Sequence, residues 1–372
     1  MRRLLGSLLF VSTLHAAEPL LVQTEVFRSG EAGYHTYRIP SLITTRKGTL
    51  LAFCEGRKNS RGDSGDIDLL LKRSFDGGKT WTPFQVVVNQ EGDTIGNPCP
   101  VVDRKSGTIW LLLTSNPGNA TEKEILNSEG EGTRSVWLTH SRDDGASWAS
   151  PVEITQSVKL ADWTWYATGP GNGIQLKSGR MVIPCDHARK GTKTMHSHVV
   201  YSDDYGRSWK LGGVVGEGTN ECQLVELVDG TLMINMRNYL GLQRRVIATS
   251  QDGGLSWSEL EPDAALIDPV CQASFLRFTL KGKAGKSRLL FSNPADIRRV
   301  NMTLQLSYDE GKTWPIARQL HEGPAAYSSL AILKDQSIGC LYERGETHPY
   351  ERITFARFNL EWLSNGRDHL KK

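Results

Sequence analysis

Five copies of the pattern Ser-x-Asp-x-Gly-x-x-Trp divide this 372-residue chain into segments of similar length. They follow one another at intervals of 67, 61, 48 and 57 residues and begin at Ser74, Ser141, Ser202, Ser250 and Ser307. Such an octapeptide does not recur five times by chance, and repeats near this period are typical of the blades of a β-propeller. The repeat therefore predicts an all-β fold built from similar blades.

Each copy, called an Asp box below, follows a strand-like run such as IDLLLKR before Ser74 and has the composition of a turn. The aspartate can accept hydrogen bonds from the turn's backbone N–H groups, the glycine can adopt a positive φ, and the tryptophan can cover the apolar side. Calcium or sugar binding is the alternative function, but one carboxylate per turn cannot supply the six or more oxygens around Ca²⁺. We therefore expect the boxes to be structural hairpins.

The N-terminus resembles a secretory signal peptide. Two arginines precede an apolar run from Leu4 to Leu14, and small residues follow at Ala16 and Ala17. The run is shorter than the roughly 20 residues of a membrane-spanning helix, and no later segment approaches that length. We predict a signal peptide over residues 1–17, one domain over residues 18–372, and a secreted or periplasmic protein without a membrane span.

Charge and cysteine content exclude several functions. Without the two arginines of the signal peptide, 42 basic residues face 41 acidic ones, so no global field attracts nucleic acid or anionic membranes. The six cysteines include no CxxC pair, which argues against a metal site. Cys54, Cys185 and Cys340 lie in apolar, strand-like stretches, where buried free thiols are favoured, while disulfide pairing stays open.

The motif YRIP at residues 37–40, together with the five Asp boxes, closely resembles the exo-α-sialidases of the bacterial and lysosomal type. The resemblance covers nearly the whole mature chain. It implies a six-bladed β-propeller that forms the catalytic domain over residues 18–372. It also implies that sialylated glycans, glycoproteins or glycolipids are hydrolysed with retention of configuration, without a metal or an organic cofactor.

A sialic acid carries a carboxylate on its anomeric carbon, and planar guanidinium groups bind such an anion bidentately. Sialidases use three arginines, and the matching positions are Arg38, Arg237 and Arg299. Arg38 and Arg237 lie in apolar strand-like stretches, where an arginine without an anionic partner would be costly to bury. Arg298 is the neighbouring alternative to Arg299.

The resemblance also implies the reacting groups. Tyr327 in GPAAYSSL matches the nucleophile, and a phenol suits this substrate because it brings no negative charge toward the anomeric carboxylate before it reacts. A phenol with a pKa near 10 needs a neighbouring base, and Glu221 matches that base, with Glu226 as the weaker alternative. Asp63, in the loop NSRGDSG, matches the general acid, whereas Asp66 and Asp68 lead directly into a strand.

Other residues match supporting positions of the family. Glu343 in CLYER corresponds to the carboxylate that orients Arg38, with Glu351 as the alternative. Five further residues correspond to the walls of the substrate pocket: Glu55, Arg57, Asn97, Trp165 and Tyr166. For the two aromatic residues, core packing is a nearly equal alternative.

Two other functions stay open at this level. A trans-sialidase or an intramolecular variant would pass the sugar to a hydroxyl group instead of water. A sialoside-binding propeller without catalysis would need the arginines, but it would have no use for the tyrosine, glutamate and loop aspartate. The linkage preference and the oligomeric state are beyond the sequence.

Overall fold

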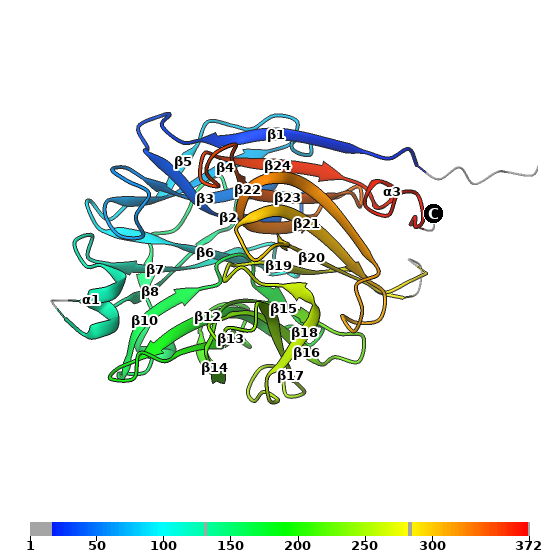
Figure 1. The fold of residues 1–372 in the computed structure, drawn as a ribbon. Coiled ribbons are helices and arrows are strands. Elements are labelled where there is room, and N and C mark those ends of the chain that lie inside the picture. Colours follow the sequence, from blue (N-terminus) through cyan, green and yellow to red (C-terminus); the bar gives the residue numbers. More distant parts are fainter. Residues whose placement is uncertain (1–16, 130–131, 282–284, 371–372) are drawn as a thin grey trace, which may run out of the picture.

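The computed structural model describes residues 17–129, 132–281 and 285–370, which form an all-β protein (Figure 1). Residues 1–16 of the predicted signal peptide lie outside the described part of the chain. No helix in the described ranges is long and apolar enough to cross a membrane.

The described strands form four sheets, of seven, five, four and eight strands. The seven-stranded sheet continues from one blade to the next through the long strand β22, and the eight-stranded sheet joins two blades through a single parallel β4–β6 pair, so the four sheets contain six antiparallel blades. The first blade contains β2 (Thr36–Thr44), β3 (Leu50–Arg57), β4 (Ile67–Ser74) and β5 (Gln85–Val88). The second contains β6 (Thr94–Val102), β7 (Ile109–Asn116), β8 (Ser135–Ser141) and β9 (Val152–Glu153). The third has an inner strand in two pieces, β10 (Trp163–Thr168) and β11 (Ile174–Gln175), which both pair with β12 (Met181–Arg189). Its third and fourth strands are β13 (Met195–Ser202) and β14 (Lys210–Glu217).

The remaining three blades follow in chain order. The fourth contains β15 (Thr219–Glu226), β16 (Leu232–Asn238), β17 (Arg244–Ser250) and β18 (Glu261–Ile267). The fifth contains β19 (Ser274–Thr279), β20 (Arg288–Pro294), β21 (Val300–Ser307) and the first half of β22 (Ile316–Ile332). The sixth contains the second half of β22, then β23 (Ile338–Arg344), β24 (Arg352–Phe358) and β1 (Leu21–Arg28).

Contacts between blades close the ring. The inner strand β2 packs against β6 on one side and β22 on the other, β15 packs against β12 and β19, and β19 packs against β22. The N-terminal strand β1 pairs with β24 and so completes the last blade, as Figure 1 shows. The predicted six-bladed β-propeller is therefore confirmed.

All five Asp boxes follow the third strand of a blade, and their hydrogen bonds are nearly identical. In the second blade, the Ser141 hydroxyl donates to Asp143 Oδ1 over 2.8 Å and accepts from the Gly145 N–H over 2.9 Å, while Asp143 also accepts from the backbone N–H and the hydroxyl of Ser147. These bonds lower the pKa of Asp143 to about 2. The sixth blade has no box because its third and fourth strands, β24 and β1, are not consecutive in the chain.

Apolar clusters fill the spaces between neighbouring blades. Leu42 and Cys54 of the first blade, for example, share a cluster with Leu341 and Phe355 of the sixth. The six cysteines are all buried and free, as expected for Cys54, Cys185 and Cys340. The glycine of the first Asp box, Gly78, has a φ of +86° and a Cβ there would lie 1.9 Å from Phe355, so the box fits tightly against this core.

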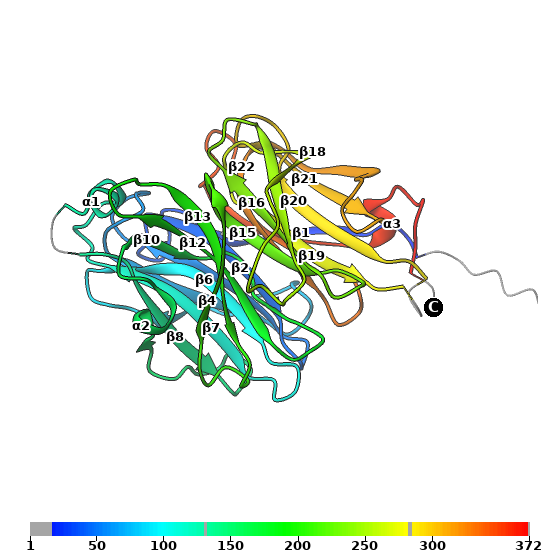
Figure 2. The ribbon, with the colours of Figure 1, turned by 90° about the horizontal axis from the view of Figure 1, so that it is seen from below.

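The described helices are short and peripheral (Figure 2). α1 (Glu122–Asn127) contacts β10, α2 (Thr155–Val158) contacts β8 and β14, and α3 (Leu360–Leu363) contacts β22. A capping box starts α1: the Thr121 hydroxyl accepts from the Glu124 N–H, and the Glu124 carboxylate accepts from the Thr121 N–H. This helix lies beside the pocket described next.

Candidate active site

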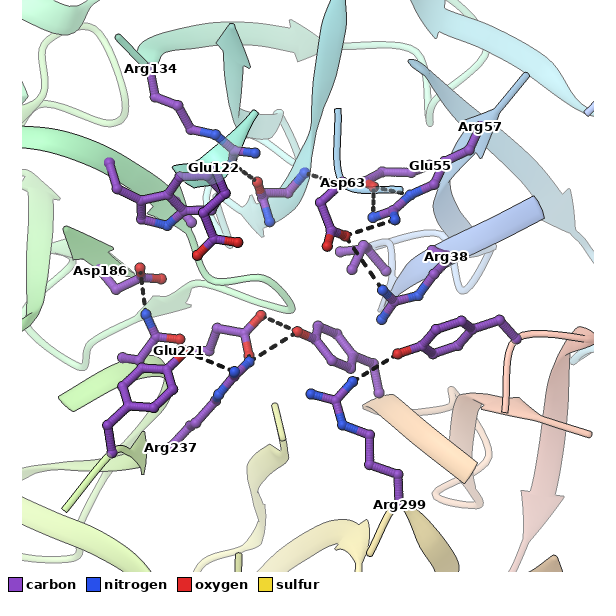
Figure 3. A pocket seen from close by; sticks show the side chains of 18 residues that line it. Arg38, Glu55, Arg57, Asp63, Glu122, Arg134, Asp186, Glu221, Arg237 and Arg299 are labelled. Atoms are coloured by element: carbon purple, nitrogen blue, oxygen red, sulfur yellow. Dashed lines mark hydrogen bonds and ion pairs between the residues drawn. The ribbon is translucent and has the colours of Figure 1, made fainter. Parts of the chain in front are cut away.

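A polar pocket opens at one end of the inner strands. Ten of the residues expected at the site line it, as Figure 3 shows: Arg38, Glu55, Arg57, Asp63, Asn97, Trp165, Glu221, Arg237, Arg299 and Tyr327. They come from all six blades: Arg299 lies in the loop before β21, and the others lie in strands or loops of the remaining five blades. The fold thus gathers residues that lie far apart in the sequence.

Irregularities in the inner strands aim these side chains into the pocket. The antiparallel register shifts at one point in each of five strands, at the segments 38–41 in β2, 96–99 in β6, 163–166 in β10, 219–222 in β15 and 325–328 in β22. Each interval contains at least one residue of the pocket. Bulges near active sites commonly re-aim side chains in this way.

Two of these bulges include a proline preceded by a residue with a left-handed backbone. Ile39 has a φ of 59° before Pro40, and Asn97 has a φ of 53° before Pro98. A β-branched residue is strained in this region, and proline has no N–H to donate to the neighbouring strand. The strained backbone of Ile39 is therefore part of the bulge that places the neighbouring Arg38 in the pocket.

Glu343 on β23 fixes Arg38 from behind the pocket. Its fully buried carboxylate accepts from Arg38 Nε over 3.1 Å and from Arg38 Nη2 over 3.3 Å, and also from the N–H groups of Ile39 and Tyr327 over 2.8 and 3.1 Å. Arg38 Cζ also lies 3.8 Å from the centre of the Tyr350 ring. The structure therefore gives Glu343 the orienting position expected for it, and one carboxylate connects the first arginine to the backbone of Tyr327.

Tyr327 and Glu221 form a close pair. The Tyr327 hydroxyl donates to Glu221 Oε1 over 2.5 Å, and Arg237 Nη1 lies 2.7 Å from Glu221 Oε2 and 3.4 Å from the Tyr327 oxygen. Burial, and then the charge of Glu221, raise the pKa of Tyr327 well above its ordinary value, although three arginines oppose this. The phenol is therefore neutral at rest, and Glu221 is the group placed to take its proton.

Arg299 completes the cationic side of the pocket. Its Nη1 donates to the Tyr350 hydroxyl over 2.8 Å and its Nη2 to the Val270 carbonyl over 2.9 Å. No carboxylate of the described residues forms an ion pair with it. The neighbouring Arg298 points outward, with 75% of its side chain exposed. Arg38 Cζ and Arg299 Cζ lie 4.9 and 5.7 Å from the centre of the Tyr327 ring, and Arg237 Nη1 lies 3.4 Å from its hydroxyl oxygen. Three cations around Tyr327 are the arrangement required for an anionic ligand.

Asp63 lies on the loop between β3 and β4, and its side chain is 56% exposed. Its Oδ1 lies 2.7 Å from Arg57 Nη1 and 3.6 Å from Arg38 Nη1. Partial desolvation opposes its ionisation, but Arg57 and Arg38 outweigh this effect and lower the pKa of Asp63. Arg57 also donates to the carbonyls of Arg61 and Gly62, so it shapes the loop that carries Asp63.

A buried network extends from Arg57 along the wall of the pocket to Trp165. Glu55 accepts from Arg57 over 2.6 Å and from the Asn97 N–H over 2.9 Å. Asn97 Oδ1 accepts in turn from Arg134, whose guanidinium lies 3.7 Å from the centre of the Trp165 ring. Trp165 therefore forms the expected wall of the pocket, backed by a cation.

Tyr166 does not line the pocket, so the sequence-based assignment to the substrate site is wrong for this residue. Its side chain is fully buried and packs against Trp163 and His198. Of the two neighbours on β10, only Trp165 lines the pocket, and core packing is the alternative that holds for Tyr166.

The alternatives considered for the reacting groups lie elsewhere. Glu226 sits at the other end of β15 and accepts from the Lys177 N–H. Asp66 and Asp68 pair with Lys58, and Glu351 accepts from three N–H groups of its own loop.

The structure adds residues that the sequence did not reveal. They line the same pocket and are Glu122, Arg134, Asp186, Asn220, Tyr239 and Tyr350. None lies in a distinctive motif, and only the position of Asp186 in the strand-like MVIPCDH stretch could have suggested a buried carboxyl group. Among the described residues, no cluster of three or more histidine, cysteine or acidic side chains has the geometry to hold a metal ion.

Comparison with known proteins defines the class of this propeller. Residues 48–341 match the BNR repeat-like domain family. A sialidase of Bacteroides fragilis is 34% identical over 357 residues, and an exo-alpha-sialidase of Aspergillus fumigatus is 35% identical over 372 residues. Both matches cover 90% of this chain, which spans 64% of the first relative and 86% of the second.

The solved structure of a Hadza microbial sialidase agrees with these relatives. It matches with a TM-score of 0.83 and 33% identity, and the match covers 90% of this chain and 68% of that one. The chain therefore belongs to the sialidase family.

Proposed function

We propose that this protein is a retaining exo-α-sialidase that removes terminal sialic acid from glycoconjugates through a glycosyl-tyrosine intermediate. The observation that carries the proposal is the 2.5 Å hydrogen bond from the Tyr327 hydroxyl to Glu221, inside a ring of three arginines. A nucleophile beside its base, surrounded by cations, suits a substrate with an anionic group at the reacting carbon.

Substrate binding uses the cationic side of the pocket. The sialic acid carboxylate lies between Arg38, Arg237 and Arg299, which places the anomeric carbon beside the Tyr327 oxygen. Of these three arginines, only Arg299 has no ion-pair partner among the described residues, so it gains the most from the incoming anion.

Glycosylation breaks the bond between the anomeric carbon and the leaving oxygen. Tyr327 attacks the anomeric carbon and its proton passes to Glu221, while Asp63 gives a proton to the leaving oxygen. In the free enzyme Arg57 and Arg38 hold Asp63 ionised. The substrate carboxylate neutralises part of the charge of Arg38, which favours the protonated acid that the step requires.

Hydrolysis then reverses these roles. Asp63 takes a proton from water, the resulting nucleophile attacks the anomeric carbon, and the Tyr327 oxygen leaves and regains its proton from Glu221. Two displacements on opposite faces leave the configuration of the sugar unchanged. The leaving group and the water both reach the carbon from the exposed side of Asp63.

The two alternatives differ in what they require. A binding propeller has no use for the contact between Tyr327 and Glu221, and an enzyme that transfers the sugar would need an acceptor at the place of water. Product analysis with and without an acceptor sugar distinguishes hydrolysis from transfer.

We also propose that the protein is secreted or exported to the periplasm, because its first 17 residues resemble a signal peptide. Sequencing the N-terminus of the exported protein would test this proposal.

The decisive experiment uses a fluorinated sialosyl donor that forms the intermediate but hydrolyses slowly. We expect mass spectrometry of a digest to find the adduct on Tyr327, and the Tyr327→Phe variant to form none. Tyr239→Phe is the matched control, because its hydroxyl contacts Arg237 over 2.8 Å but not Glu221. An adduct on Asp63 or Glu221 would refute the assigned nucleophile, and absence of turnover of an aryl α-sialoside would refute the activity.

A further inference from the structure

Asp186 is a pocket carboxyl group to which the mechanism above assigns no role. It belongs to β12, is fully buried, and lines the pocket. Its Oδ1 accepts from Asn220 Nδ2 over 2.9 Å, whereas its Oδ2 has no hydrogen-bond partner among the described residues. Figure 3 shows Asp186 on the side of the pocket opposite Arg38 and Arg57.

The surroundings of Asp186 differ from those of the carboxylates that pair with arginines in or behind the pocket. Glu343, Glu221 and Asp63 each lie within 4 Å of an arginine, but Asp186 forms no ion pair in the described chain. The charged or titratable groups that influence it from neighbouring elements are Glu221, Arg237, Arg134 and Glu122. Burial, and then the charge of Glu221, raise its pKa well above the ordinary value, although the two arginines oppose this.

The groups behind Asp186 do not supply a charge either. Burial raises the pKa of Tyr166, Cys185 and Cys222 well above their ordinary values, so all three are neutral there. An isolated carboxylate in such a place would be costly, whereas a protonated carboxyl has one oxygen to accept from Asn220 and one O–H to donate. A buried O–H without a partner needs an acceptor, and the pocket in front of it is where a ligand binds.

We propose that Asp186 is a substrate-binding residue that presents a protonated carboxyl group and donates a hydrogen bond from Oδ2 to an uncharged oxygen of the bound sugar. The inference rests on the proposed sialidase function. Because the arginines hold the sugar carboxylate on the other side, the acceptor belongs to the part of the sugar remote from the anomeric carbon. The N-acyl carbonyl and the glycerol hydroxyls of sialic acid are oxygens of this kind. A neutral donor also avoids the repulsion that a second anion would exert on an anionic substrate.

Two substitutions distinguish a neutral donor from an ionised acceptor. Asp186→Asn keeps an oxygen for the Asn220 amide and supplies an N–H donor, so we expect its KM at mildly acidic pH to stay within about threefold of the wild type. Asp186→Ala removes the donor and should raise KM about five- to tenfold, as expected for one lost hydrogen bond. If Asp186→Asn raises KM as much as Asp186→Ala does, the neutral donor is refuted.

The pH dependence gives a second readout. The donor exists only while Asp186 is protonated, so the wild-type KM should rise as the pH passes the raised pKa of Asp186, and this rise should be absent in Asp186→Asn. Two substrate analogues identify the acceptor, one without the N-acyl group and one with a shortened glycerol chain. The rise in KM caused by Asp186→Ala should vanish for the analogue that lacks the acceptor oxygen. An unchanged effect with both analogues refutes the assigned contact.

Stability separates this inference from the proposed function. A carboxyl group with a raised pKa in the folded state stabilises the fold at low pH, and this contribution is lost as the pH rises through that pKa. Relative to the wild type, Asp186→Asn should therefore gain stability in urea unfolding as the pH rises above about 4, the ordinary pKa of an aspartate. If the free energies of unfolding of the two proteins changed in parallel with pH, the protonated state of Asp186 would be refuted, even if neither protein hydrolysed a sialoside. If the expected stability difference were seen but the wild type hydrolysed no sialoside, only the proposed sialidase function would be refuted.

Discussion

Replacement of Glu343 tests the connection between the first arginine and the nucleophile. Its Oε1 accepts from Arg38 Nε and the Ile39 N–H, and its Oε2 accepts from Arg38 Nη2 and the Tyr327 N–H. In Glu343→Gln the carbonyl can keep one pair of bonds, but the amide NH₂ must face the other two donors. In Glu343→Ala a buried guanidinium loses its carboxylate altogether.

The expected cost of Glu343→Ala follows from these contacts. Removing one member of a buried ion pair typically costs about 3–5 kcal/mol. Because the entropy of unfolding is about 2 cal/mol/K per residue, this corresponds to a fall in Tm of about 5 °C for a chain of this size. Misplacement of a substrate-positioning group by about 1 Å can cost about 100-fold, so kcat/KM should fall by about 10- to 100-fold, mainly through KM.

The assay combines thermal unfolding with the hydrolysis of an aryl α-sialoside. Glu351→Gln is a matched control, since Glu351 also accepts from several backbone N–H groups but does not contact Arg38. It should lower Tm while KM stays unchanged. A Glu343→Gln enzyme with the Tm and kcat/KM of the wild type would refute the orienting role of Glu343.

Three further predictions concern the acid, the third arginine and the boxes. Asp63→Ala should spare turnover of substrates with an activated phenol leaving group but not of a sialyl disaccharide; equal losses on both would contradict its role as the acid. Arg299→Ala should lower kcat/KM by the equivalent of about 2–5 kcal/mol, whereas the exposed Arg298→Ala should not. Asp143→Asn should lower stability in urea at pH 7, and the difference should shrink as the pH falls from about 4 toward the pKa of about 2, because the native bonds favour the ionised form.

The sequence predicted the fold and most of the site because both depend on short motifs. The Asp boxes mark the turn between the third and fourth strands of a blade, so they report architecture directly. Five boxes could not by themselves indicate six blades, since the last blade joins the two ends of the chain through β1 and β24. The number of blades came from the resemblance to a family.

The pocket residues that the sequence motifs did not indicate are important only because of where the fold places them. Asn220 and Tyr350 are ordinary polar residues in sequence, and they become significant only because Asp186 and Arg299 lie next to them. Such neighbours belong to different blades, and no local pattern encodes their distance. Tyr166 is the converse case: it lies in a segment that does reach the pocket, but its own side chain is buried in the core.

The prolines of the inner strands offer a physical signal for part of this missing information. A proline inside a strand cannot donate to its neighbour, so it indicates a bulge rather than a regular ladder. Pro40 and Pro98 both follow a residue with a positive φ, and the two bulges bring Arg38 and Asn97 to the pocket. β15 carries a comparable bulge between Thr219 and Cys222 without any proline, so the sequence gives no local mark for the turn that aims Glu221 at the nucleophile. The residue types in the sequence therefore predict the chemistry of such a site. The direction of each side chain, in contrast, depends on register shifts that form only when the neighbouring strands pair.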